Sequence, residues 1–328
     1  MERAKYLITK DIKKSIKKNK TQVEQLSNDW FLKYSQHLND FQKEGLNESG
    51  VELNTFEHHL FDNRSKRINH VEFDKNELQE FNVNHKNKLV SVVGLINRSA
   101  HRWVIGLHDW SENKYQSLRM LEQYRKNGYN IISFDTTGHG KDLNEKTDLW
   151  YSTISTIDEI IRNIKDNYLM SQVGLVGVGF GASAAIAHSE IGKKKSSVNW
   201  IIADSPISDL DTYFKYDLQN NFTNMDWWKV SFNFLDKFKR SLEIKYDFDI
   251  LKDIKKSFKT PIMFIASTNN KKVPHWMTEE LYENKIKFEK EQISELWLTN
   301  KSEHQKIVSD FGKEYMEKTF NFSSKWEK

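Results

Sequence analysis

From about residue 88 to the C-terminus, short strand-like runs alternate with segments of helical periodicity. The runs are rich in β-branched and aromatic residues, and apolar residues recur at helical spacing between most of them. This alternation is typical of a mostly parallel sheet covered by helices on both faces, so the sequence predicts an α/β fold. The predicted strands are 89–96, 103–108, 130–135, 172–178, 198–204, 261–267 and 293–299, and the predicted helices are 113–127, 147–167, 181–192, 276–286 and 306–322.

One edge of this sheet is predicted to be antiparallel. The run at 89–96 is expected to pair through a short turn with residues 101–107, and the stretch VEFD at 71–74 precedes it as a further candidate strand.

Two segments do not follow the alternation. Residues 1–65 are rich in Lys, Asn and Gln, with apolar residues every four positions, and they predict an N-terminal helical extension. Its basic face is expected to be solvated rather than to contact a membrane. Residues 207–258 are helical in pattern and aromatic, and they predict a helical cap inserted into the main domain, 66–325.

Composition excludes several classes of function. The 50 Lys and Arg residues nearly balance the 46 Asp and Glu residues, so charge gives no reason to expect a nucleic-acid partner. The chain has no cysteine, hence no disulfide and no thiolate metal site. No apolar run is long enough to cross a bilayer, and the basic N-terminal residues lack the apolar core of a signal peptide. We expect a cytoplasmic protein without metal or cofactor.

Ligands of a parallel sheet gather at the carboxyl ends of its strands. One such end reads GVGFG at 177–181, after a predicted strand and before a predicted helix. Taken alone, Gly177, Gly179 and Ala182 match a G-x-G-x-x-A dinucleotide fingerprint, and Asp204 ends the next strand. The helix N-terminus would then hold a pyrophosphate. A dinucleotide-binding protein is therefore one alternative.

A second interpretation accounts for more of the chain. In order, the sequence has a strand ending at His108, then FDTTGHG (134–140), LVGVGFGASAA (175–185), ADSP (203–206), TPIMFIASTNNKKVP (260–274) and a late His304 before a terminal helix. This series resembles the α/β-hydrolase superfamily, in particular bacterial esterase and serine-aminopeptidase-like members, over about residues 85–325. The resemblance implies the α/β-hydrolase fold and a Ser–His–acid triad.

Two positions of that triad lack the expected chemistry. The nucleophile elbow, G-x-S-x-G in the family, has Gly179 where the serine would be. The acid position is occupied by Asn270, which has the shape of an aspartate without its charge. Only the histidine, His304, matches the pattern. Asp204 is a possible substitute acid, because some members of the fold recruit an acid after that strand.

Binding groups around the predicted elbow do not depend on the serine. The resemblance places oxyanion-hole amides at Phe180 and near Asp109 or Trp110, where a carbonyl or carboxylate could still dock. Asp109 stands where the family usually has glycine, and its carboxylate could repel an oxyanion or bind a cation or hydroxyl instead. His108 is expected to form the loop rather than to react.

These observations favour a catalytically degenerate serine hydrolase that binds a small apolar or ester-like ligand, or a protein partner, at the former active site. The alternative within the same fold is an active hydrolase on ester or amide bonds, with a rearranged site around His304 and Asp204.

Overall fold

The structure is a computed structural model, and it describes residues 75–86, 88–110, 112–142, 151–221 and 249–327. The predicted N-terminal extension at 1–65, the candidate strand at 71–74 and the central part of the predicted cap lie outside the described residues. The division into domains therefore stays a prediction.

The described residues form one eight-stranded sheet with the order β1-β2-β4-β3-β5-β6-β7-β8. β1 and β2 are antiparallel to each other, β2 is antiparallel to β4, and all other neighbours are parallel. The strands are β1 (Gln79–His85), β2 (Lys88–Leu95), β3 (Arg102–Leu107), β4 (Asn130–Phe134), β5 (Gln172–Val178), β6 (Trp200–Asp204), β7 (Ile262–Ser267) and β8 (Glu295–Thr299).

The mostly parallel sheet with an antiparallel edge is confirmed, but the predicted pairing of 89–96 with 101–107 is wrong. β4 lies between β2 and β3, and Val92 of β2 is paired with Phe134 of β4. The neighbour of β2 on its other side is β1, whose polar residues are typical of an exposed edge strand. The prediction of the pairing failed because the periodicity within one strand does not show which other strand is its hydrogen-bonded neighbour.

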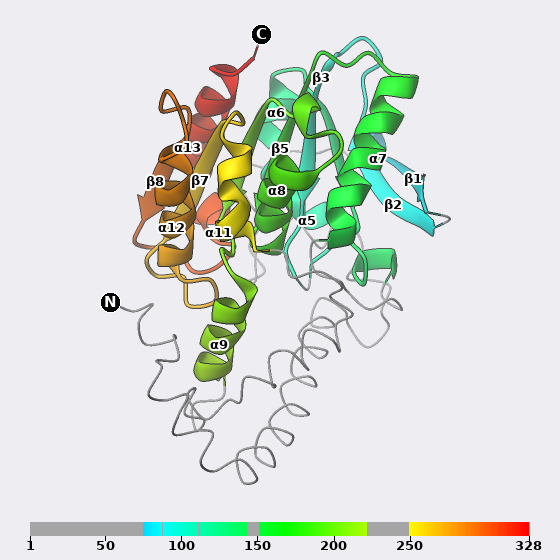
Figure 1. The fold of residues 1–328 in the computed structure, drawn as a ribbon. Coiled ribbons are helices and arrows are strands. Elements are labelled where there is room, and N and C mark those ends of the chain that lie inside the picture. The colour runs from blue at the N-terminus through cyan, green and yellow to red at the C-terminus, as the bar shows by residue number, and fades with distance from the viewer. Residues whose placement is uncertain (1–74, 87, 111, 143–150, 222–248, 328) are drawn as a thin grey trace, which may run out of the picture.

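Helices cover both faces of the sheet, as Figure 1 shows. On one face, α7, α8, α11 and α12 enclose a core that includes Trp103, Phe134 and Phe264. On the other face, α5, α6 and α13 pack on Trp200, where Tyr124 of α6 is stacked at 5.1 Å between ring centroids. The helices are α5 (Lys114–Leu118), α6 (Glu122–Lys126), α7 (Tyr151–Asn167), α8 (Phe180–Ile191), α9 (Leu210–Asn221), α11 (Ile250–Asp253), α12 (His275–Ile286) and α13 (Ile307–Ser324).

Two details of the helices differ from the predicted segments. The segment at 113–127 forms two short helices, α5 and α6, instead of one. At the end of the predicted cap, Ile250 and Ile254 are buried in the same core as α8, so this part packs directly on the main body. Short one-turn helices also occur at Lys75–Glu77, Gly140–Asp142, Lys195–Ser197 and Ile254–Ser257.

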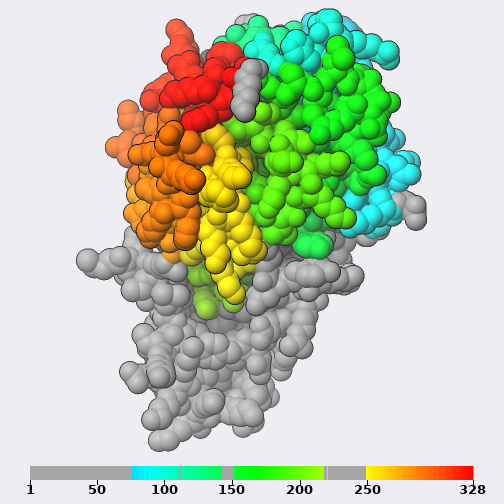
Figure 2. All heavy atoms as spheres, turned by 45° about the horizontal axis from the view of Figure 1, so that its top comes forward, coloured from blue at the N-terminus to red at the C-terminus, as the bar shows by residue number. Residues whose placement is uncertain are grey.

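β1 and β8 form the two edges of the sheet, and in Figure 2 the first strands, in cyan, lie on the side opposite the orange segments. Within the described part of the chain, no helix combines the length and the apolar character that a membrane span would need. The carboxyl ends of β3, β5, β6 and β7 are next to one another in this arrangement, and they carry the residues singled out from the sequence.

Candidate functional site

A sharp turn joins β5 to α8 at Gly179. Its φ of 54° and ψ of −118° lie where a residue with a side chain is strained. The Gly179 amide donates to the backbone oxygen of Asp204 at 2.8 Å, which fixes the turn against the end of β6. This is the strained strand-to-helix geometry expected of a nucleophile elbow, and the residue at its tip has no side chain to present.

The carboxylate of Asp109, which follows β3, fills the space beside that turn. Its Oδ1 accepts a hydrogen bond from the Phe180 amide at 2.7 Å. Its Oδ2 accepts from His304 Nε2 at 2.6 Å and from Gln305 Nε2 at 2.8 Å. A Cβ atom on Gly179 would lie 2.2 Å from both Cγ and Oδ1 of Asp109. The aspartate therefore occupies the volume that a serine side chain at position 179 would need.

Asp109 is held as an anion by these contacts. Burial by itself would raise the pKa of its carboxyl, but the adjacent His304 ring and the hydrogen bonds from His304, the Phe180 amide and Gln305 outweigh burial and lower the pKa to about 2. The side chain is 3 % exposed. A carboxylate buried with this many donors is a fixed part of the site.

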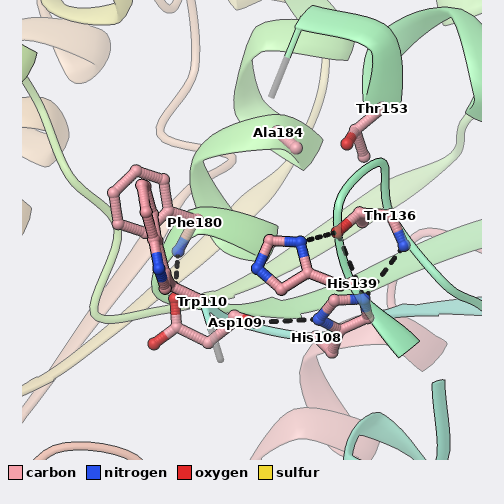
Figure 3. Close-up of a pocket in the computed structure, with 9 residues that line it drawn as sticks. His108, Asp109, Trp110, Thr136, His139, Thr153, Phe180 and Ala184 are labelled. Atoms are coloured by element: carbon pink, nitrogen blue, oxygen red, sulfur yellow. Dashed lines mark hydrogen bonds between the residues drawn. The ribbon is translucent and has the colours of Figure 1, made fainter. Parts of the chain in front are cut away.

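The amides predicted to form an oxyanion hole are bonded to carboxylates of the protein itself. The Phe180 amide is bonded to Asp109, and the Asp109 amide donates to Glu112 Oε2 at 2.9 Å. The other oxygen of Glu112 pairs with Arg119 at 3.0 Å, so this second carboxylate is also anchored. A ligand carbonyl would have to displace Asp109 to reach the Phe180 amide. Figure 3 shows that bond and the adjoining Trp110 ring.

Asn270 sets the tautomer of His304. Its Oδ1 accepts from the amides of Lys272 and Val273, each at 3.0 Å, so its NH₂ group must face the histidine. Nδ2 lies 3.1 Å from His304 Nδ1 and therefore donates to it, which leaves the ring proton on Nε2, facing Asp109. A general base for a serine needs the opposite tautomer, with Nε2 free to accept a proton.

Asp204 is linked to Asn270 through the hydroxyl of Ser205. Its Oδ1 accepts from the Ser205 hydroxyl at 2.8 Å, and Ser205 Oγ accepts from Asn270 Nδ2 at 3.2 Å. Burial raises the pKa of the Asp204 carboxyl to about 6, against the lowering effect of the Ser205 hydrogen bond. Asp204 thus reaches His304 through Ser205 and Asn270, where a substitute triad acid would accept directly from the histidine.

The structure brings together the residues predicted for the site, in the roles just described. His108 is bonded to two loops: its Nε2 accepts from the Thr136 amide at 3.0 Å, and its Nδ1 donates to the backbone oxygen of Asp109 at 2.7 Å. Sequence reasoning missed Gln305 and Glu112 as partners of Asp109, and it gave Ser205 no part. The available signal for Gln305 was its position beside His304.

A dinucleotide phosphate at Gly177 and Gly179 would need free backbone amides, but the Gly179 and Phe180 amides already donate to groups of the protein. No set of three or more histidine, aspartate and glutamate side chains is placed to hold a metal ion within the described ranges.

Comparison with solved structures finds the same architecture in hydrolases. An esterase from Pyrococcus furiosus matches with a TM-score of 0.62 and 23 % identity over 77 % of this chain and 92 % of that chain. An acylaminoacyl peptidase from Pyrococcus horikoshii matches with a TM-score of 0.56 and 14 % identity, covering 76 % of this chain and 40 % of that chain. Est1E from Butyrivibrio proteoclasticus gives a TM-score of 0.55 and 9 % identity over 74 % and 98 % of the two chains.

No family model and no curated protein matches the sequence. The topology, the elbow and these structural neighbours together define the fold class: this chain has the α/β-hydrolase fold, as its sequence predicts. Its structural neighbours include esterases and acylaminoacyl peptidases.

Proposed function

We propose that this α/β-hydrolase-fold protein does not hydrolyse esters or amides through a serine, and that it acts as a binding protein at the former active site. The observation that carries the proposal is the Asp109 carboxylate, which lies where the side chain of residue 179 would be and is bonded to both the Phe180 amide and His304. The Asp109 carboxylate thus fills the volume beside residue 179 and also accepts the hydrogen bond of the Phe180 amide, the expected oxyanion donor.

Three separate losses support an inactive site. Without a hydroxyl at 179 no acyl intermediate can form, and removing the serine of a serine protease costs about 10⁶-fold in turnover. The Asn270 amide holds His304 in the tautomer that cannot accept a proton at Nε2, a change worth about 10⁴-fold in a serine protease. The oxyanion donor is bonded to a carboxylate. These effects overlap, so they do not multiply.

No observation favours the rearranged hydrolase built on His304 and Asp204, since Ser205 and Asn270 stand between the two side chains. A small apolar molecule or a protein partner is the ligand class that we propose. It would bind beside the Asp109 carboxylate, because an ester carbonyl would have to compete with that carboxylate for the Phe180 amide.

Hydrolysis of short-chain p-nitrophenyl esters and labelling by a fluorophosphonate test this proposal. We expect the native protein to be silent in both assays. The variant Gly179→Ser/Asn270→Asp should also be silent, because Asp109 remains in the serine's place. Adding Asp109→Gly to those two substitutions removes the obstruction and should give labelling and turnover.

The matched comparison is between the double and the triple variant, which differ only at Asp109. Turnover by the native protein that His304→Ala abolishes would overturn the proposal. Equal labelling of the double and triple variants would show that Asp109 does not obstruct the elbow.

A further inference from the structure

A small pocket lies beside Asp109, at the carboxyl ends of β3 and β4. Its walls come from the loops after these two strands and from the first turns of α7 and α8. The pocket is partly open, and its enclosed room is about that of one water molecule, which is enough for a hydroxyl group whose carbon chain lies in the open part. Figure 3 shows Trp110 and Phe180 on one side, Thr153 and Thr136 on the other, and the His139 ring between them.

Three buried polar atoms belong to residues that line this pocket and have no hydrogen-bond partner within the described part of the chain. They are Trp110 Nε1, His139 Nε2 and Thr153 Oγ1. The three residues are 4 %, 4 % and 2 % exposed. Buried polar groups are nearly always paired, so three unpaired ones on residues that line a single small pocket point to a polar occupant there, either water or the polar group of a ligand.

The hydrogen-bonding roles of these atoms follow from their neighbours. His139 Nδ1 donates to the backbone oxygen of Thr137 at 3.1 Å, so Nε2 carries no proton and is an acceptor. Burial, together with the nearby His108, lowers the pKa of His139 to about 3, so the ring stays neutral at physiological pH. The indole nitrogen of Trp110 can only donate, whereas the Thr153 hydroxyl can do either.

The charge of Asp109 further limits the chemical class of the ligand. Asp109 is one of the residues that line the pocket, and the negative charge of its carboxylate repels an anion. The carboxylate would attract a cation by its charge, but Trp110 Nε1 can only donate, so a cation would leave that group unpaired. A neutral hydroxyl group fits the remaining set, because it can accept from an indole and donate to an imidazole. The Phe180 ring and Ala184 supply apolar wall for the carbon that carries it.

We propose that this pocket binds the hydroxyl group of a small neutral alcohol in place of water. The inference deepens the proposed function, on which it rests, by naming the ligand class of the binding site. Binding there involves no bond making or breaking.

Nuclear magnetic resonance of the full-length, ¹⁵N-labelled protein tests this directly. The Trp110 indole signal is identified by its loss in Trp110→Phe, and 1-propanol is then titrated into the native protein. We expect saturable shifts of the Trp110 indole and of the His139 ring nitrogens. Propylammonium and 1-fluoropropane, which match 1-propanol in size, and propionate, which is one atom larger, should not give these shifts.

The variant Thr153→Val keeps the shape of the side chain and removes its hydroxyl. It should weaken 1-propanol binding about two- to tenfold, the range for one hydrogen bond. Thr278→Val is the matched control, since Thr278 is fully buried in α12 and its hydroxyl is also unpaired, away from this pocket. The control should bind 1-propanol as the native protein does. The His139 ring nitrogens report 1-propanol binding without the Trp110→Phe variant, and the isosteric Thr153→Val can therefore be compared with the native protein even if Trp110→Phe does not fold.

Shifts that do not saturate would overturn the proposal, since the pocket would then hold water only. Equal affinity for 1-fluoropropane would also overturn it, since the pocket would then select ligands by size and not by the hydroxyl group. Unchanged affinity in Thr153→Val would also overturn it. Ester hydrolysis, measured on the same samples, reports on the proposed function separately. A protein that hydrolyses esters and also binds 1-propanol saturably would refute the inactive site and keep the hydroxyl pocket.

Discussion

The space beside Gly179 gives a quantitative prediction about stability. In Gly179→Ala the new Cβ would lie 2.2 Å from the Asp109 carboxylate, whereas real contacts of this kind stay above 3.0 Å. The carboxylate must move, and its hydrogen bonds to Phe180, His304 and Gln305 must lengthen or break. Separating a buried charge from its partner costs about 3–5 kcal/mol. A side chain at a φ of 54° adds about 1–3 kcal/mol of backbone strain.

We therefore expect Gly179→Ala to lower the free energy of unfolding by about 4–8 kcal/mol in the native background. In the Asp109→Gly background only the backbone strain remains, so the same substitution should cost about 1–3 kcal/mol. The difference, about 3–5 kcal/mol, is the coupling between the two positions. Urea denaturation of the four proteins measures it, provided that the slope with denaturant is unchanged.

Gly128→Ala is the matched control. Gly128 also has a positive φ, 76°, but a Cβ there would have no atom within 4 Å. It should show backbone strain alone and no coupling to Asp109. If Gly179→Ala costs no more than Gly128→Ala, and its effect adds to that of Asp109→Gly without coupling, the carboxylate does not occupy the place of a side chain at 179.

Two further predictions concern the groups behind His304. The folded-state pKa of Asp204, about 6, is above its ordinary value of 3.8, so its contribution to stability is fully present below about pH 4 and is lost as pH rises through 6. Asp204→Asn should remove this loss of unfolding free energy, about 3 kcal/mol between pH 4 and 7, as measured by urea denaturation. If the unfolding free energy of Asp204→Asn depends on pH as strongly as that of the native protein, the raised pKa does not belong to Asp204. Asn270→Asp replaces a donor to His304 Nδ1 with an acceptor, so ¹⁵N spectra of the ring should show the proton arriving at Nδ1. A proton that stays only on Nε2 would refute the role given to Asn270.

Much of the fold could be predicted from the sequence because it depends on local patterns. Seven strands and the helices after them follow from β-branched runs and helical spacing, and the turn at Gly179 follows from a glycine-rich strand end. β1 was not predicted, because its residues QEFNVNH are mostly polar, as an exposed edge strand allows. The wrong pairing of β2 with β3 has another cause: β4, the next strand after β3, lies between them, and the local pattern of each strand does not show this order.

In the candidate site, too, local sequence patterns predict some side chains but not the contacts between them. Gly179, Asn270 and His304 could be found from motif positions, and Asp109 stood out because glycine was expected there. That the Asp109 carboxylate would turn into the vacant volume at 179 could not be predicted, because its position depends on Phe180, His304 and Gln305 meeting in three dimensions. The tautomer of His304 likewise depends on the orientation of an amide that is fixed by two backbone groups.

The Asp109 carboxylate also makes the effect of a serine at position 179 depend on which residue stands at position 109. A serine at position 179 is obstructed while Asp109 is present, so Gly179→Ser by itself is expected to lower stability. Removing Asp109 first leaves the Phe180 amide and His304 without their partner and confers no chemistry by itself. Either substitution alone is expected to cost stability, so a serine at position 179 and a small residue at position 109 are expected to be tolerated together better than separately.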